Sequence, residues 1–292
     1  MELHQLRYLV AVVEEGSFTA AAARVHVSQS GVSAQIAKLE QDLGQRLLER
    51  GPRSLRLTAA GEAVLPIARA VLAGVDRIGE VSDEFSGVVR GRVRMGMIRG
   101  CSIPPFLDAL AEFRLGHPGV QLVLLEDDSD VLQRQVLSTE LDLALVGWAG
   151  EVLAGLDVDT IVDEPVAAVL ATDHRLARRR TIRWADLAGE TLLCLPRGTG
   201  VRAAVDLSRA AAGVDPRVDL EASSPDTLIG LAGRGAGVAL LSESMAVGAQ
   251  DVLARVVSDA TVTARLGLVA REGQLPSAPR ALLERLRAAL TA

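Results

Sequence analysis

Small polar side chains within residues 17–44 have the types and spacing needed to read DNA bases. Gln29, Ser30 and Ser33 recur three and four residues apart, which places them on one face of a helix beginning after Ser28. A glutamine can donate to and accept from one adenine edge, and small side chains allow close approach. The opposite face would be apolar and buried: Val32, Ile36, Leu39 and Leu43. The pattern predicts a helix that enters a major groove, with an ordinary helical hairpin as the alternative.

A second group of residues could bind a small molecule. Loops at residues 98–102, 127–129 and 196–200 each follow an expected strand. Ligands of open α/β sheets bind beyond the carboxyl ends of the strands, where helices begin and offer free N–H groups. A guanidinium there can hold a carboxylate with two hydrogen bonds, which predicts a small organic anion. The candidate contacts are Arg99, Gly100, Cys101, Ser102, Asp128, Arg197 and Thr199.

These candidate contacts also have simpler interpretations. Arg99 and Arg197 could each form a surface salt bridge instead of binding a ligand. Two acids follow a neighbouring strand, and they could neutralise Arg99 or favour a cationic ligand. Ser102 and Thr199 could act as N-caps, although a capping hydroxyl can also touch a ligand.

Three helices would position the base-reading residues. The first is expected at residues 3–15, and the other two lie within residues 17–44. Ser17 or Thr19 would cap the second helix, His26 and Val27 would form the connection, and Ser28 would cap the third. A short hairpin, or wing, is expected at residues 50–57, where Arg53 could enter a minor groove or remain solvated. The complete set of candidate DNA contacts is Thr19, Ser28, Gln29, Ser30, Ser33, Lys38, Arg50 and Arg53.

A long helix is expected from Thr58 to Phe85. Its apolar positions alternate four and three residues apart, which is typical of a coiled-coil seam. A helix with one such stripe needs a partner, and the simplest partner is a second copy of the chain. The seam residues are Val64, Ala68, Val71, Val75, Ile78, Ser82 and Phe85.

The remainder of the chain alternates strands and helices. This repeated βαβ pattern predicts parallel sheets with right-handed crossovers, in two α/β subdomains with a cleft between them. Expected strands are 93–97, 120–126, 141–146, 165–171, 191–195, 217–221, 237–241 and 264–270. Expected helices are 104–115, 130–137, 200–211, 224–233 and 276–290.

Composition narrows the class of protein. A length of 292 residues suggests about two domains, and the net charge of −6 argues against broad nucleic-acid binding, although residues 50–56 hold three arginines and no acid. No signal peptide or membrane span is expected, so we expect a cytoplasmic location. Cys101 and Cys194 could be redox-active, but buried thiols are the favoured interpretation. No cofactor or metal site is expected, because none of the four histidines has metal-ligand spacing.

Residues 1–62 resemble the N-terminus of LysR-type transcriptional regulators. The matching stretches are residues 3–12, Gly16–Thr19 with the alanines that follow, Ser28-Gln29, Val32-Ser33, Gln35-Ile36, Leu39-Glu40, Leu43-Gly44, Leu47, and residues 50–61. Two departures concern the base-reading helix. The family usually has Pro-Ala where this chain has Ser30-Gly31, and usually arginine where it has Ala34, which removes a DNA contact.

The resemblance implies an α/β effector domain of two periplasmic-binding-protein-like (Rossmann-like) subdomains, preceded by an all-α winged helix-turn-helix domain and a long linker helix. The expected boundaries are 1–58, 59–87 and 88–292, with lobe I at 88–161 and 266–292 and lobe II at 162–265. It implies an effector-controlled transcriptional regulator, not an enzyme. The expected partners are double-stranded DNA, the small-molecule effector, further copies in a homodimer or homotetramer, and RNA polymerase. A solute-binding protein or an enzyme on the same two-lobed domain is the alternative.

Overall fold

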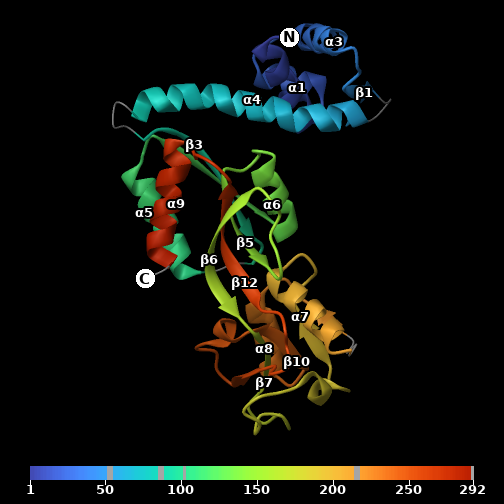
Figure 1. Ribbon diagram of the computed structural model, residues 1–292, viewed down its shortest axis with the longest axis vertical. Helices are drawn as coiled ribbons and strands as arrows, with labels where there is room; N and C mark the ends of the chain where they lie inside the picture. Colours follow the sequence, from blue (N-terminus) through green and yellow to red (C-terminus); the bar gives the residue numbers. More distant parts are fainter. Residues whose placement is uncertain (51–54, 85–88, 101–102, 214–217, 291–292) are drawn as a thin grey trace. The chain divides into compact units, whose positions relative to one another are not determined.

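The computed structural model describes residues 1–50, 55–84, 89–100, 103–213 and 218–290 (Figure 1). The chain forms two compact units: Met1–Val88 with Ser138–Glu140, and Val89–Leu137 with Leu141–Ala292. Among the described residues, no helix combines the length and the hydropathy needed to cross a membrane.

Three helices open the first unit, as predicted: α1 (Leu3–Glu15), α2 (Phe18–Arg24) and α3 (Gln29–Leu43). Ser17 caps α2 by accepting a hydrogen bond from the Ala20 amide, so Thr19 is not the cap. Ser28 caps α3 by accepting from the Gly31 amide at 3.1 Å. A hydroxyl at an N-cap satisfies an amide that the helix itself leaves free, and this fixes where each helix begins.

The core of the first unit forms where the three helices meet. Val32, Ile36 and Leu39 are buried as predicted, but Leu43 is 38% exposed. The apolar spacing of α3 therefore continues past the part of the helix that other elements cover. Leu6, Leu9, Val12, Ala21 and Ala22 complete most of this core.

A short hairpin and a long helix follow. Strands β1 (Leu48–Arg50) and β2 (Leu55–Leu57) pair antiparallel, and residues 51–54 between them lie outside the described part. Helix α4 (Ala59–Glu84) starts after Thr58, whose hydroxyl accepts from the Gly61 amide at 2.9 Å.

The predicted seam of α4 divides into two parts. Ala68 is buried in the core of its own unit, and Val64 packs against that core. Val71 and Ile78 are 41% and 72% exposed, and Ile67, which the seam did not include, is 63% exposed. The prediction of one continuous seam is therefore wrong for its first turns, which pack within the chain. Phe85 lies outside the described residues.

The first sheet of the second unit has the strand order β4-β3-β5-β12-β6, and we call the part built on it lobe I. Its strands are β3 (Gly91–Ile98), β4 (Val120–Asp127), β5 (Leu143–Trp148), β6 (Leu156–Glu164) and β12 (Ala264–Arg271). Helices α5 (Pro104–Gly116) and α9 (Ser277–Leu290) lie side by side on one face, and α6 (Ser129–Leu137) covers the other (Figure 1). The fully buried β5 contributes alternate residues to the two faces.

The second sheet has the order β11-β7-β10-β8-β9, and we call the part built on it lobe II. Its strands are β7 (Val166–Ala171), β8 (Leu192–Cys194), β9 (Val218–Glu221), β10 (Val238–Ser242) and β11 (Val252–Val256). Helices α7 (Gly200–Ala211) and α8 (Pro225–Gly233) contribute Val201, Val205 and Leu228 to its core. Two 3-10 turns, Trp184–Leu187 and Glu243–Ala246, complete the lobe.

The sheets differ from the prediction in two respects. The predicted strands are all present, but the sheets are mixed instead of parallel, because β12 runs antiparallel to β5 and β6, and β7 runs antiparallel to β10 and β11. Strands β6 and β11 were not predicted. The sequence of β6, LDVDTIVDE, places acids between its apolar residues, so it lacks the continuous apolar run of a buried strand.

Candidate DNA-reading helix and interlobe site

The first turn of α3 presents its polar residues to solvent. Ser28, Gln29 and Ser30 are exposed, and Ser33, one turn further along, is half-buried. The Ser28 and Ser30 hydroxyl oxygens lie 3.2 Å apart, so the capping residue also orders the next serine. Exposed residues at the start of a helix can reach base edges, because a recognition helix enters the groove with its N-terminal residues.

The other predicted DNA contacts are less closely grouped. Thr19 and Lys38 are both exposed, on α2 and in the third turn of α3. Arg50 ends β1, but its side chain lies outside the described part, as does the whole of Arg53. The structure therefore presents Ser28, Gln29, Ser30 and Ser33 of the predicted DNA-binding set together at the start of α3.

Two side chains that position α3 escaped the sequence analysis. Gln5 on α1 is fully buried and donates to Oε1 of Gln35 on α3 at 3.1 Å. Glu40 accepts hydrogen bonds from the backbone amides of Leu47 and Leu48 at 2.8 and 3.1 Å, and so joins the end of α3 to β1. A glutamine or a glutamate in a helix gives no sequence signal of such a role, because both residues are usually solvated.

Arg99 at the end of β3 is paired with two acids. Its Nη2 lies 2.6 Å from Oδ1 of Asp127, and its Nη1 lies 3.3 Å from Oδ1 of Asp128. The guanidinium remains 53% exposed, so solvent weakens both pairs. The surface salt bridge predicted as one interpretation of Arg99 is therefore present, and its contact with an effector stays a prediction. Of the other predicted residues in this loop, Cys101 and Ser102 lie outside the described part.

The lobe II loop is closed by a threonine. The Thr199 hydroxyl caps α7 by accepting from the Arg202 amide at 3.4 Å, and it donates to the Pro196 carbonyl at 2.9 Å. Arg197 in the same loop is exposed. No partner for its guanidinium is found among the residues that the structure describes.

The loops of the two lobes contact each other directly. The Ser129 amide at the start of α6 donates to the Gly198 carbonyl of lobe II at 3.2 Å. A β-carbon on Gly198 would lie 3.1 Å from Cβ of Asp128, and one on Gly147 would lie 3.2 Å from the Gly200 amide nitrogen. The backbones approach closely because these positions are glycines.

Cys194 ends β8 within the core of lobe II. The thiol is free and buried, and burial raises its pKa to about 12. The prediction of a buried small hydrophobe is confirmed for this cysteine. Because the thiolate is the reactive form, the thiol is unreactive near neutral pH.

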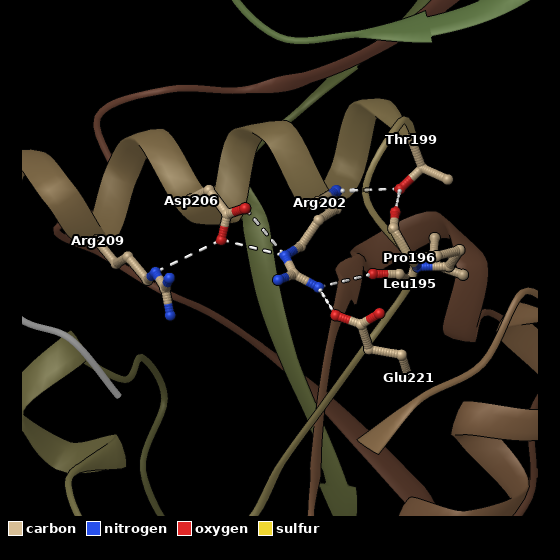
Figure 2. Close-up of polar contacts among 7 residues, drawn as sticks. All are labelled: Leu195, Pro196, Thr199, Arg202, Asp206, Arg209 and Glu221. Carbon is tan, nitrogen blue, oxygen red and sulfur yellow. Dashed lines mark hydrogen bonds and ion pairs between the residues drawn. The ribbon is translucent and has the colours of Figure 1, made fainter. Parts of the chain in front are cut away.

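A buried arginine beside this cysteine was also missed. The Arg202 side chain is 5% exposed, and its Nε donates to both oxygens of Asp206 at 3.1 and 3.0 Å (Figure 2). Burial alone would lower its pKa, but hydrogen bonds to Glu221 and Asp206 outweigh this and raise it, so the group stays charged. Arg202 lies in the first turn of α7, just beyond the loop in which Arg197 and Thr199 were predicted as effector contacts. Its partner Glu221 is the last residue of β9.

Two protein families match the chain in succession. The family described as "Bacterial regulatory helix-turn-helix protein, lysR family" matches residues 3–62, and "LysR substrate binding domain" matches residues 86–291. The "Hydrogen peroxide-inducible genes activator" of Pectobacterium carotovorum is 33% identical over 82% of this chain and 80% of its own length. The "DNA-binding transcriptional dual regulator OxyR" of Escherichia coli is also 33% identical, over 82% of this chain and 79% of its own length.

Solved structures match nearly the whole chain. A full-length OxyR variant from Pseudomonas aeruginosa has a TM-score of 0.75 and 27% identity, covering 99% of this chain and 94% of that one. Full-length CbnR in complex with its target DNA has a TM-score of 0.60 and 25% identity, covering 99% and 100%. These relatives are transcriptional regulators, which decides against the enzyme and solute-binding alternatives. The chain, with its helix-turn-helix unit and two-lobed α/β effector domain, belongs to the LysR family of bacterial DNA-binding transcriptional regulators.

Proposed function

We propose that this regulator responds to a small organic anion bound between lobes I and II. The observation that carries the proposal is the direct contact between the strand-end loops of the two lobes, through the Ser129 amide and the Gly198 carbonyl. A ligand that enters there changes how the lobes meet. Such a ligand can shift the equilibrium between lobe arrangements by as much as its affinities for those arrangements differ.

Arg197 is the cation best suited to hold the anion. It is exposed beside the start of α7, where the helix dipole favours negative charge. Arg99 is the weaker candidate, because Asp127 and Asp128 already neutralise it. Gly100, Thr199 and the two residues at 101 and 102 would complete the site, with Asp128 selecting against ligands of higher negative charge.

At the DNA, we propose that Gln29, Ser30 and Ser33 contact base edges. Thr19, Ser28, Lys38, Arg50 and Arg53 would contact the backbone or an adjacent groove. The exposed first turn of α3 supports this assignment for Ser28, Gln29 and Ser30. Ala34 and Gly31 offer no side-chain donor, so the number of contacts from this helix is small, and sequence selectivity depends strongly on Gln29.

A peroxide response is the second candidate, because several relatives are named as hydrogen peroxide-inducible genes activators. Cys194 is unsuited to that chemistry, since its buried thiol has a raised pKa and oxidation proceeds through the thiolate. Any thiol chemistry in this chain would therefore rest on Cys101.

We further propose the assembly and location of the regulator. The exposed apolar residues Ile67, Val71 and Ile78 on α4 would pair with the same residues of a second copy, and two dimers would form a tetramer. The DNA-binding region would comprise residues 1–58, the linker 59–87 and the effector region 88–292, with lobe I at 88–161 and 266–292 and lobe II at 162–265. A regulator of chromosomal genes acts in the cytoplasm, where RNA polymerase is a candidate partner.

A panel of small carboxylates and small amines tests the effector class. Thermal unfolding of the full chain is measured with each compound, because a ligand that binds only the folded state raises the melting temperature. We expect stabilisation by one or more carboxylates and by none of the amines. Stabilisation by amines alone would refute an anionic effector. Loss of DNA-binding activity on treatment with peroxide, abolished by Cys101→Ser, would favour the second candidate.

A further inference from the structure

Two separate loops of lobe II contact lobe I. The first loop, residues 196–200, receives the hydrogen bond from Ser129 through the Gly198 carbonyl. The second loop follows β9, and its Ser223 carbonyl oxygen would lie 2.7 Å from a β-carbon on Gly100. The two contacts thus lie at two different strand ends of lobe I. One is at the start of α6, just after β4, and the other is in the residues that follow β3.

Backbone hydrogen bonds connect these two loops only where the loops leave strands β8 and β9. Strands β8 and β9 pair in parallel up to Cys194 and Glu221, and the Ala222 amide donates to the Cys194 carbonyl at 3.2 Å. Beyond that point, the Arg202 side chain continues the connection. Its Nη1 donates to the Leu195 carbonyl at 3.3 Å and to Oε1 of Glu221 at 2.5 Å (Figure 2).

Arg202 also orders the first loop from its other end. Its backbone amide donates to the Thr199 hydroxyl, which in turn donates to the Pro196 carbonyl. Side chain and backbone of one residue therefore hold the loop from Leu195 to Thr199 at both ends, as Figure 2 shows. A buried guanidinium suits this task, because its several donors lie in a fixed plane.

The two carboxylates on Arg202 have different structural consequences. Asp206 lies four residues further along α7, so its bond to Arg202 stays within one helix. Arg209 pairs with the same aspartate at 3.5 Å, which balances two cations with two carboxylates in the cluster. Glu221 ends β9 and immediately precedes the second loop. Its bond to Arg202 is therefore a link between the two loops that contact lobe I.

We infer that Arg202 and Glu221 are positioning residues that make the two interlobe contacts open and close together. Neither residue needs to touch the effector for this role. The biological purpose of this coupling rests on the proposed function, because coupled loops would transmit the effect of a ligand bound at one contact to the other contact. It does not depend on the identity of the ligand.

Hydrogen exchange of the Ser129 amide in the full chain tests the coupling. This amide belongs to lobe I but donates to lobe II, so its exchange rate reports opening of the contact across the lobes. Glu221→Ala removes the link between the loops, while Asp206→Ala removes the other carboxylate from the same arginine and leaves that link in place. Amides of the buried strand β10 report global unfolding in each variant.

We expect Glu221→Ala to accelerate exchange at Ser129 by about fivefold or more while β10 stays protected, since local opening can change without global unfolding. Asp206→Ala should change the exchange rate at Ser129 by less than about twofold, because the link between the loops remains in this variant. Unchanged exchange in Glu221→Ala, or equal acceleration in both variants, would overturn the inference. The effector proposal would survive either result, because its own test is the ligand panel on the unmodified chain.

Discussion

Arg99 and Asp127 form an ion pair with 2.6 Å between Nη2 and Oδ1, and Asp128 takes the other terminal nitrogen of the same guanidinium at 3.3 Å. Two carboxylates thus face one cation at the end of β3. These three side chains together carry a net negative charge, which favours attraction of the proposed anionic effector from the lobe II side. The pairing therefore moves the expected cationic contact from Arg99 to Arg197.

The charges around this site give opposite predictions for two variants. Arg197→Ala should weaken the binding of a carboxylate that stabilises the wild type by roughly 1.5–3 kcal/mol, the usual magnitude of a hydrogen bond to a charged group. Asp128→Asn should strengthen the binding of the same carboxylate, because this substitution removes a negative charge that repels the ligand. Titration calorimetry with the carboxylate found in the panel measures both. Weaker binding in Asp128→Asn, with Arg197→Ala unaffected, would show that the acids are the recognition groups.

Gln29→Ala should lower the affinity for the specific operator by about 1–3 kcal/mol, the usual magnitude of one paired side-chain contact to a base. Affinity for scrambled DNA should change little, because a base contact carries selectivity. Fluorescence anisotropy at fixed salt measures both affinities. Gln41→Ala is the matched control, since Gln41 is an exposed glutamine near the other end of the same helix. Equal effects of the two substitutions would remove Gln29 from the base-reading set.

Val71→Asp should dissociate the dimer without unfolding the chain. Val71 is 41% exposed within one chain, so the aspartate is tolerated in the monomer but would place a charge in the interface. Sedimentation at micromolar concentration should shift to the monomer. Ala68→Asp gives the contrast: Ala68 is buried in its own unit, so this variant should lose thermal stability. A Val71→Asp protein that sediments as the wild type would place the interface elsewhere.

Cys194 should make the stability fall with rising pH above about 9. Burial raises the folded-state pKa of this thiol from 9.0 to about 12. Between these values the unfolded chain loses the proton while the folded chain keeps it, so the unfolded state gains stability as pH rises. Below about pH 9 the thiol is protonated in both states, and its contribution does not vary with pH.

Urea denaturation at several alkaline pH values measures this slope, and Cys194→Ala is the control. Besides Cys101, the chain has one lysine and one tyrosine, so few other groups titrate in this range, and all of them are present in the control as well. The variant should show a shallower decline than the wild type. Identical slopes for the two proteins would mean that the thiol ionises equally well in the folded and unfolded states.

The helix-turn-helix unit was predictable because its determinants are local. Ser28 and the stripe of Val32, Ile36 and Leu39 lie within a few turns of one helix, and periodicity with a capping hydroxyl defines both the start and the buried face. Antiparallel strands were harder, since β12 returns from a distant part of the chain to pair with β5 and β6. Sequence spacing alone contains no information about that pairing.

The polar contacts of the candidate site were the least predictable part. The loops carrying Arg99 and Thr199 could be located, because both follow strands. The partners of Arg202 could not: Glu221 is far along the chain and half-exposed, so its type and neighbours suggest a solvated side chain. Only the register of β8 against β9 brings the two residues together.

The hydrogen bond between the buried Gln5 and the half-buried Gln35 has a consequence for genetics. Gln5 is covered by protein and cannot touch an operator, yet its hydrogen bond fixes the orientation of α3. Selection for regulators that have lost repression or activation should therefore return alleles at position 5 beside those at position 29. The variant proteins encoded by such alleles would accumulate in the folded form. Their normal abundance in the cell would distinguish them from variants that are inactive because they are unstable.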